Sequence, residues 1–261
     1  MALPKQVKYL LTTIELPSNK NIKLKVRPFT GEEEKLFLIL KESKESPEKV
    51  QETIVQVITN CIVESPSTFQ IKDLCLFDIE WIFLQLHSIS IDNTLEFTYN
   101  NADNIKSGEC KEGECPTEIK IQIPVSDIQI AYPENVNKNI VLYDREDIGM
   151  LGIKLKYPTA EMMPSIVELE KKDESTQLEE MIFLCLENFF DKEQTYVPDR
   201  NDPKEVEDAK KLIAGFTFEQ RKEIKAFFEN MPSVKHTFEV HCPKCGFRES
   251  ITLQGLDNFF L

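Results

Sequence analysis

Apolar and polar residues alternate along several short stretches of the chain, and this period of two predicts β-strands. The first two such stretches, residues 7–16 and 22–29, are separated by a polar segment that begins at Pro17, which predicts a hairpin. Further stretches in the middle of the chain alternate or are rich in β-branched residues, as strands are. They cover residues 95–99, 118–125, 140–143 and 153–157.

Other stretches repeat apolar residues every three or four positions, which is typical of helices. Thr30 and Glu33 have the spacing of a capping box ahead of the continuous apolar run 36–40. Ser46 and Pro47 predict the start of a second helix, as its N-cap and first residue. The apolar stripe of this second helix consists of Val50, Ile54, Val57, Ile58, Cys61 and Ile62.

Three more helices are predicted. One covers residues 77–86, and another starts at Thr176 and Glu179, which have capping-box spacing. Thr217 and Gln220 start the last helix in the same way. The stripe that follows Thr176 consists of Leu178, Met181, Ile182, Cys185, Leu186 and Phe189.

The order of these elements predicts the fold class. The charged segment 191–208 contains Pro198 and Pro203 and is predicted to be a loop or flexible connection. Strands and helices are grouped and do not alternate, which predicts an α+β fold of grouped helices with small antiparallel sheets. Four parts are expected: an N-terminal hairpin plus helices (1–93), a β-rich segment (94–158), a helical segment (159–235), and a C-terminal hairpin (236–261) that packs with residues 94–130.

The composition excludes several classes of protein. The formal net charge of −14 argues against broad binding to nucleic acid or anionic membranes, because both need a positive surface. The longest apolar run, residues 181–186, is far below the roughly 18–20 residues that span a bilayer. No secretory signal is visible, so we expect a cytoplasmic protein. In a reducing compartment its seven cysteines are expected to be thiols or metal ligands before disulfides.

Four of the seven cysteines form two pairs. Cys110 and Cys115 are separated by four residues, and Cys242 and Cys245 by two. Each pair lies in a polar stretch between two strand-like segments, so each is predicted to be a hairpin turn that presents two thiolates. The flanking glycines allow the positive-φ turns that such sites use. They are Gly108, Gly113 and Gly246.

Two turns of this kind can surround one zinc ion with four sulfurs. We therefore predict one structural zinc per chain, bound by Cys110, Cys115, Cys242 and Cys245 in a zinc-ribbon-like module formed by two distant hairpins. The strand after each pair is predicted to join one small sheet. Four thiolates leave no open coordination position, whereas a catalytic zinc keeps a bound water.

The sequence is also compatible with other states of these cysteines. They are unbound thiols, redox chemistry, a local disulfide between Cys110 and Cys115, and replacement of one sulfur ligand by His236 or His241. The remaining cysteines, in contrast, fit small buried hydrophobic side chains. They are Cys61, Cys75 and Cys185.

Motifs for catalysis are missing from the sequence. It contains no phosphate-binding glycine loop and no G-x-S-x-G nucleophile motif, so no catalytic residue and no organic cofactor is predicted.

The run 36–40 is apolar on every face of its helix, and further large apolar groups lie at 81–86 and 258–261. Such residues are either buried inside the fold or reserved for another protein.

Four stretches of the chain, taken in order, carry a family resemblance. They are VRPFTGEEEKLFLIL near the start, LCLFDIEWIFLQL near residue 80, IGMLGIKLKYP near 150, and FENMPSVKHTFEVHCPKCGFRESITLQGLDNFF at the end. Together they resemble the baseplate hub and hub-assembly proteins of contractile-tailed bacteriophages (myoviruses), over nearly the whole chain.

The resemblance implies a non-enzymatic phage tail protein that acts in the assembly or structure of the central hub of the baseplate. Its partners would be other baseplate hub proteins, with no nucleic acid, membrane or small-molecule substrate. It would be found in the bacterial host cytoplasm during tail assembly or in the virion baseplate. Two alternatives stay open, a zinc-ribbon protein that binds nucleic acid or regulates, and a zinc hydrolase.

Overall fold

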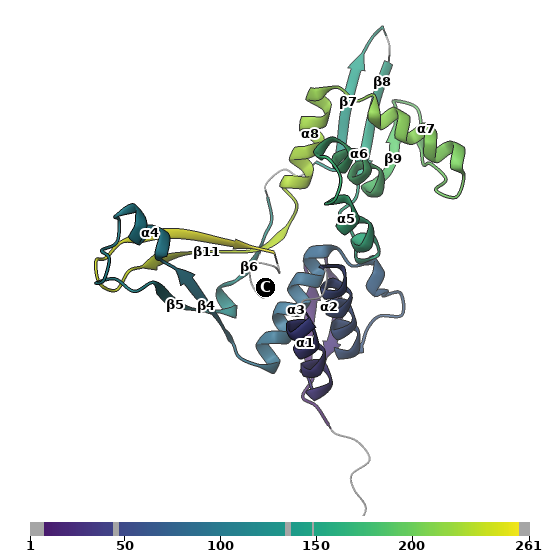
Figure 1. The fold of residues 1–261 in the computed structure, drawn as a ribbon. Coiled ribbons are helices and arrows are strands. Elements are labelled where there is room, and N and C mark those ends of the chain that lie inside the picture. The colour runs from purple at the N-terminus through teal and green to yellow at the C-terminus, as the bar shows by residue number, and fades with distance from the viewer. Residues whose placement is uncertain (1–7, 44–46, 134–136, 148, 256–261) are drawn as a thin grey trace, which may run out of the picture.

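The computed structural model describes residues 8–43, 47–133, 137–147 and 149–255, and its elements form three groups around the central helix α3 (Leu76–Ser90) (Figure 1). We call them the base (residues 8–93), the arm (94–131 and 233–254) and the lobe (139–229). The grouping of helices and small antiparallel sheets confirms the predicted α+β class. In the part of the chain described, no helix combines the length and apolar character needed to span a membrane.

The base begins with the predicted hairpin. Besides α3, the base consists of β1 (Thr12–Leu16), β2 (Asn19–Val26), β3 (Ile62–Glu64), α1 (Gly31–Ser43), α2 (Pro47–Cys61) and η1 (Ile71–Asp73). The sheet has the order β1-β2-β3 and is antiparallel. Val7, the predicted first strand residue, lies outside the described residues. Ile62 was expected on the helical stripe, but α2 ends at Cys61, and Ile62 pairs with Val26 in the sheet instead.

One face of this sheet packs against α2 and α3. The residues that meet there are Ile14, Leu16, Leu24 and Val26 from the sheet, Val57, Ile58 and Cys61 from α2, and Ile79, Ile82 and Leu86 from α3. The opposite face carries exposed ion pairs, such as Lys23 with Glu15 at 2.7 Å. The apolar run 81–86 is therefore explained by the burial of α3 between neighbouring elements.

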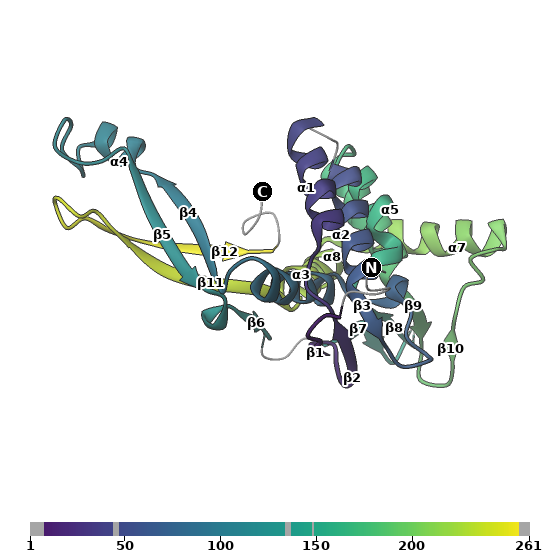
Figure 2. The same ribbon diagram turned by 90° about the horizontal axis from the view of Figure 1, so that it is seen from below.

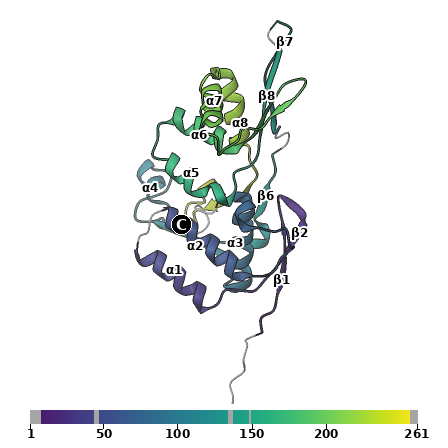
Figure 3. The ribbon, with the colours of Figure 1, turned by 90° about the vertical axis from the view of Figure 1, so that its right-hand side faces the viewer.

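The apolar run 36–40 has a different environment, because α1 lies on the outside of the base (Figures 1 and 3). Phe37 packs edge-on against Phe29 and Phe83, with ring centroids 5.4 and 5.8 Å away. Leu38 and Ile39, however, are 50% and 56% exposed. The run does not form a central buried helix. The side chain of residue 40 and the C-terminal residues 258–261 lie outside the described part of the chain.

The arm consists of two hairpins that point away from α3 and bring their turns to the same end (Figures 1 and 2). The first is formed by β4 (Thr94–Asn100) and β5 (Glu118–Pro124), with α4 (Ala102–Ser107) in its turn and η2 (Val125–Asp127) after it. The second is formed by β11 (Ser233–His241) and β12 (Arg248–Gln254), and β6 (Gln129–Ala131) pairs with β11.

The prediction that the strands after the two cysteine pairs share one sheet is wrong. β4 and β5 form a sheet of their own, and β12, β11 and β6 form another. Each hairpin has apolar side chains on one face only, so the two hairpins bury these faces against each other. The facing residues include Phe97 and Ile121 on the first hairpin and Phe238 and Leu253 on the second.

The lobe is a four-stranded antiparallel sheet with helices on one face (Figure 3). Its strands are β7 (Asn139–Arg145), β8 (Gly149–Leu155), β9 (Leu186–Phe190) and β10 (Thr195–Tyr196), in the order β10-β9-β8-β7. The covering helices are α6 (Glu174–Cys185), α7 (Pro203–Ala214) and α8 (Phe218–Glu229). Before them, η3 (Ala160–Met162) and α5 (Met163–Leu169) connect the lobe to the base.

Helix α6 begins one turn earlier than predicted. Its N-cap is Asp173, whose carboxylate accepts a hydrogen bond from the Thr176 backbone N–H at 3.0 Å, so the Thr176–Glu179 capping box is wrong. The predicted helical stripe also ran too far. Leu186 and Phe189 lie on β9, where they pair with β8, because α6 ends at Cys185.

The segment 191–208 is more ordered than predicted. It contains β10 and the first turns of α7, which begins with Pro203 behind the N-cap Asp202. The Asp202 carboxylate accepts from the Lys204 backbone N–H at 2.9 Å, and proline is favourable at the first helical position. The capping box of Thr217 and Gln220 is confirmed.

Cys61 and Cys185 are both fully buried. Burial raises the pKa of the Cys61 thiol to about 11 and that of Cys185 to about 12, so both stay protonated and unreactive. We expect Cys185→Ala to lower the free energy of unfolding by about 1 kcal/mol through a small cavity. Chemical denaturation measures this change, and rapid labelling of either thiol in the native protein would contradict the burial.

Candidate metal centre

The two cysteine pairs lie in the turns at the outer end of the arm. Cys110 and Cys115 are between α4 and β5, and Cys242 and Cys245 are between β11 and β12. Although 126 residues separate Cys115 from Cys242, the four sulfurs lie within 4.8 Å of one another. In a tetrahedral zinc site with Zn–S near 2.3 Å, the sulfurs are about 3.8 Å apart. The four side chains therefore surround a space that fits one such ion.

The local backbone explains how the turns present their sulfurs. Gly108 ends α4 in the left-handed conformation, with φ of 84°, and the Cys110 backbone N–H then donates to the Asn104 carbonyl at 2.9 Å. In the second turn, Cys242 N–H donates to the Phe247 carbonyl at 2.9 Å, and Gly246 has a φ of 75°. A side chain at either glycine would be strained, so the predicted role of these glycines is confirmed.

The surroundings of the four cysteines are uneven. Cys110, Cys115 and Cys242 are buried against Ile105, Ile119 and Phe247, whereas Cys245 is exposed. The described residues provide no larger apolar cluster at this end of the arm. The end of the arm therefore depends on its sulfurs for much of its packing.

The protonation of the cysteines is also uneven. The backbone N–H groups of Cys245 and Lys244 stabilise the thiolate of Cys242 and lower its pKa to about 6. Burial raises the pKa of Cys110 to about 12, and the neighbouring cysteine sulfurs add to this shift. A bound cation favours ionisation of all four cysteines.

A polar network next to Cys110 connects the two hairpins. Asn101 is fully buried; its Nδ2 donates to the Pro116 carbonyl at 2.9 Å, and its Oδ1 accepts from Asn104 at 3.0 Å. The Tyr99 hydroxyl, on β4, donates a hydrogen bond to the Glu249 carboxylate, on β12. None of these residues was predicted from sequence, because polar residues in a polar stretch give no periodic signal.

Neither histidine near the cysteines belongs to the cluster. The ring Nδ1 of His236 is 3.1 Å from the Asp127 carbonyl, and His241 Nε2 is 3.5 Å from the Glu239 carboxylate. Cys75 is half-buried at the N-cap of α3, far from the pairs in sequence. None of the seven cysteines forms a disulfide. The structure thus brings together the four predicted residues and leaves the other cysteines and these histidines elsewhere.

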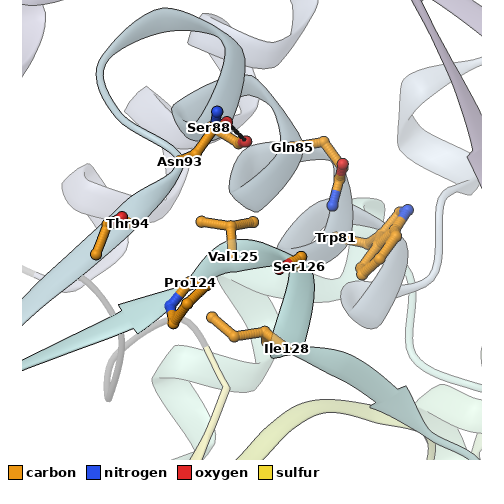
Figure 4. A pocket seen from close by; sticks show the side chains of 9 residues that line it. All are labelled: Trp81, Gln85, Ser88, Asn93, Thr94, Pro124, Val125, Ser126 and Ile128. Carbon is orange, nitrogen blue, oxygen red and sulfur yellow. Dashed lines mark hydrogen bonds between the residues drawn. The ribbon is translucent and has the colours of Figure 1, made fainter.

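A groove of about 560 Å³ lies where α3 meets the arm (Figure 4). Trp81 and Gln85 line it from α3, and Val125 and Ile128 line it from the segment after β5. Ser88 and Asn93 close one end with a 2.7 Å hydrogen bond. Among the residues that line this groove in the described chain, none is charged and none is a cysteine or histidine. The groove therefore offers no general base and no strong metal ligand.

A comparison with known protein families identifies the family of this chain. A family model described as "T4 bacteriophage base plate protein" matches residues 8–261. The chain belongs to this baseplate family. No curated protein and no solved structure matches it. The resemblance to phage baseplate proteins is thereby confirmed, and a baseplate protein has its place in the virion, assembled with other structural proteins of the phage.

The stretches that carried the resemblance have structural roles in this baseplate protein. Asp78 of α3 accepts from the Ser18 backbone N–H at 2.9 Å, which holds the β1–β2 turn. Glu80 accepts from the Val234 N–H at 3.1 Å, which holds the start of β11. The guanidinium of Arg27 forms two 3.0 Å hydrogen bonds with the carboxylate of Glu33. The first two contacts therefore join α3 to the β1–β2 turn and to the arm, and the third joins the segment after β2 to α1.

Proposed function

We propose that this protein is a non-enzymatic component of the central hub of the baseplate, as a structural subunit or an assembly factor, and that the arm holds one structural zinc ion. The baseplate family match over residues 8–261 carries the proposal. Assembly of the tail in the bacterial host cytoplasm fits a metal site built from cysteines that form no disulfide, because that compartment is reducing. The partners would be other hub proteins.

The cysteine set favours a structural role for the metal. Four sulfur ligands fill a tetrahedral zinc shell, so no position remains for water or substrate. The ion would join two hairpins that are distant in sequence and fix the shape of the arm. We infer that the arm is a rigid projection whose position is needed in the assembled hub.

Nucleic-acid binding by the zinc-ribbon-like module is the second candidate. Its first turn carries exposed glutamates, namely Glu109, Glu112 and Glu114. Like charge on the phosphate backbone repels such a surface. A gel-shift assay with duplex and single-stranded DNA at low salt distinguishes the two proposals, and we expect no shifted band.

A phage that lacks this gene tests the hub role directly. We expect normal DNA replication and normal heads, together with incomplete tails that lack a proper hub, because later baseplate assembly needs the central part. Electron microscopy of infected-cell lysates and plaque counts measure this outcome. Normal tails and normal plaque numbers from the deletion would overturn the proposal.

Complementation of that deletion tests whether α1 contacts another hub protein. Leu38 is half exposed on the outside of α1, so we expect Leu38→Asp to keep the fold but to reduce plaque numbers, because the charge would be buried at the contact. Thr13→Asp, at an exposed position of β1, is the matched control and should complement fully. Equal complementation by both variants would exclude this surface.

A further inference from the structure

The cysteine cluster has one accessible side. Cys245 is exposed, while Cys110, Cys115 and Cys242 are buried. The sulfur of Cys245 is also in contact with that of Cys110, on the other hairpin, at 3.5 Å. A reagent from solvent therefore meets Cys245 first, and the sulfur of Cys110 lies beside it.

We propose that the centre has a second, oxidised form, in which a peroxide converts Cys245 and Cys110 into a disulfide that joins the two hairpins, and the metal leaves as a result. This inference rests on the proposed metal site. A bond between residues 110 and 245 connects the same two turns as the metal does. The arm thus keeps its two hairpins linked in either form.

The chemistry needs one peroxide molecule per centre. The Cys245 thiolate attacks a peroxide oxygen, the O–O bond breaks, and the sulfur becomes a sulfenic acid while the second oxygen leaves and is protonated to water. The Cys110 thiolate then attacks the Cys245 sulfur, the S–S bond forms, and the sulfenic oxygen leaves as a second water. Two thiolates have been oxidised by two electrons, and a zinc ion that has lost two ligands is released.

Exposure and contact together favour this pair over a disulfide within one turn. Cys245 is exposed, and its sulfur is 3.5 Å from that of Cys110 on the other hairpin. The Cys242 sulfur interacts with Cys245 and Cys115, but Cys242 is buried. A bond within one turn would also leave the hairpins unconnected. A link that survives oxidation matters for a virion protein, because a virion leaves the reducing host cytoplasm for an oxidising medium.

Trypsin makes the test direct, because Lys111 and Lys244 lie inside the two pairs. Digestion places each of the four cysteines in a separate peptide: 107–111, 112–120, 236–244 and 245–248. Purified full-length protein is loaded with zinc, treated with one equivalent of hydrogen peroxide, alkylated and mapped under non-reducing conditions, while a colorimetric chelator records free zinc. We expect peptide 107–111 linked to peptide 245–248 and one zinc released per disulfide.

Other results would overturn the inference. They are a link between the two peptides of one pair, sulfinic acid at Cys245 with no disulfide, or retention of zinc with unmodified thiols. Cys185→Ala is the control, and its peptide map should match that of the unaltered protein, because Cys185 is buried far from the centre in sequence. If the protein binds no zinc, the proposed metal site fails, yet the map of the same sample still decides whether Cys110 and Cys245 pair.

Discussion

Cys242→Ser is expected to abolish metal binding and to unfold the end of the arm, while the base and the lobe remain folded. The protein as purified should contain one equivalent of zinc. In the variant, only three sulfurs remain, and the one removed is the cysteine whose pKa is lowered to about 6. Metal affinity depends on deprotonated cysteine ligands. The loss of this cysteine therefore weakens metal binding strongly.

The confined effect follows from the distribution of the core. The base and the lobe each have a large apolar cluster, built around α3 and around the sheet β10-β9-β8-β7. The end of the arm has only three half-buried apolar side chains around its sulfurs, namely Ile105, Ile119 and Phe247. Apparent binding energies of structural zinc in small peptides are about 10–16 kcal/mol at neutral pH, far above what such a small cluster supplies.

Elemental analysis and hydrogen exchange measure the two parts of this prediction. We expect no bound zinc, fast exchange of amides in residues 101–118 and 241–248, and unchanged protection in α3 and β8. Cys185→Ala is the matched control, because it removes a buried thiol of the lobe and should keep full metal content. Full metal content in the Cys110→Ser/Cys242→Ser double variant would show that the ligands have been assigned wrongly.

The sequence predicted the four cysteines as a set because their chemistry and spacing stand out locally. Cysteine pairs in polar, glycine-containing turns have few uses in a reducing compartment, and the structure places all four sulfurs within 4.8 Å. The sequence did not predict how the hairpins meet. Whether two hairpins share a sheet or stack depends on contacts between residues far apart in the chain, such as Phe97 with the cluster that includes Phe238.

The errors in the lobe have a related cause. Thr176 and Glu179 have capping-box spacing, but Asp173 lies one turn earlier and supplies the N-cap carboxylate. A local pattern cannot choose between two caps that are three residues apart. Leu186 and Phe189 continue a helical spacing, yet pairing with β8 makes them a strand. Tertiary pairing overrides periodicity in such short apolar segments.

Helix α3 contacts segments that are spread along the chain. Asp78 binds the β1–β2 turn, Glu80 binds the start of β11, and Leu84 packs with the arm cluster. The β1–β2 turn and the start of β11, which are far apart in the chain, therefore meet at one helix. These contacts of α3 set the position of the arm relative to the base.

The ion pair of Arg27 and Glu33 gives the largest expected change in stability of the base. Glu33 is fully buried, and its carboxylate accepts two hydrogen bonds from Arg27 and two more from the backbone N–H and hydroxyl of Thr30. Arg27 also donates to the Pro28 carbonyl at 2.9 Å. The sequence predicted only the Thr30–Glu33 cap; Arg27, which follows β2 and lies six residues before Glu33, carried no capping signal of its own.

We expect Glu33→Ala to lower the free energy of unfolding by about 3–5 kcal/mol, because it leaves the guanidinium of Arg27, whose side chain is only 15% exposed, without its counter-ion. Chemical denaturation measures the loss. Glu34→Ala is the matched control, since Glu34 is exposed on the same turn of α1, and should change stability by less than about 0.5 kcal/mol. The double variant Arg27→Met/Glu33→Leu should recover much of the loss, because apolar side chains of similar size need no partner.

The same pair predicts how stability depends on pH. The hydrogen bonds from Arg27, followed by those from Thr30, lower the pKa of Glu33 to about 2 against the opposing effect of burial. A carboxyl with a lowered pKa stabilises the fold above its unfolded pKa, near 4.3, and loses this contribution as pH falls toward 2. The contribution is roughly 3 kcal/mol at neutral pH. The unaltered protein should therefore lose more stability between pH 5 and pH 2 than Arg27→Met/Glu33→Leu does, and equal acid sensitivity of the two proteins would show that this carboxylate is not the group that titrates.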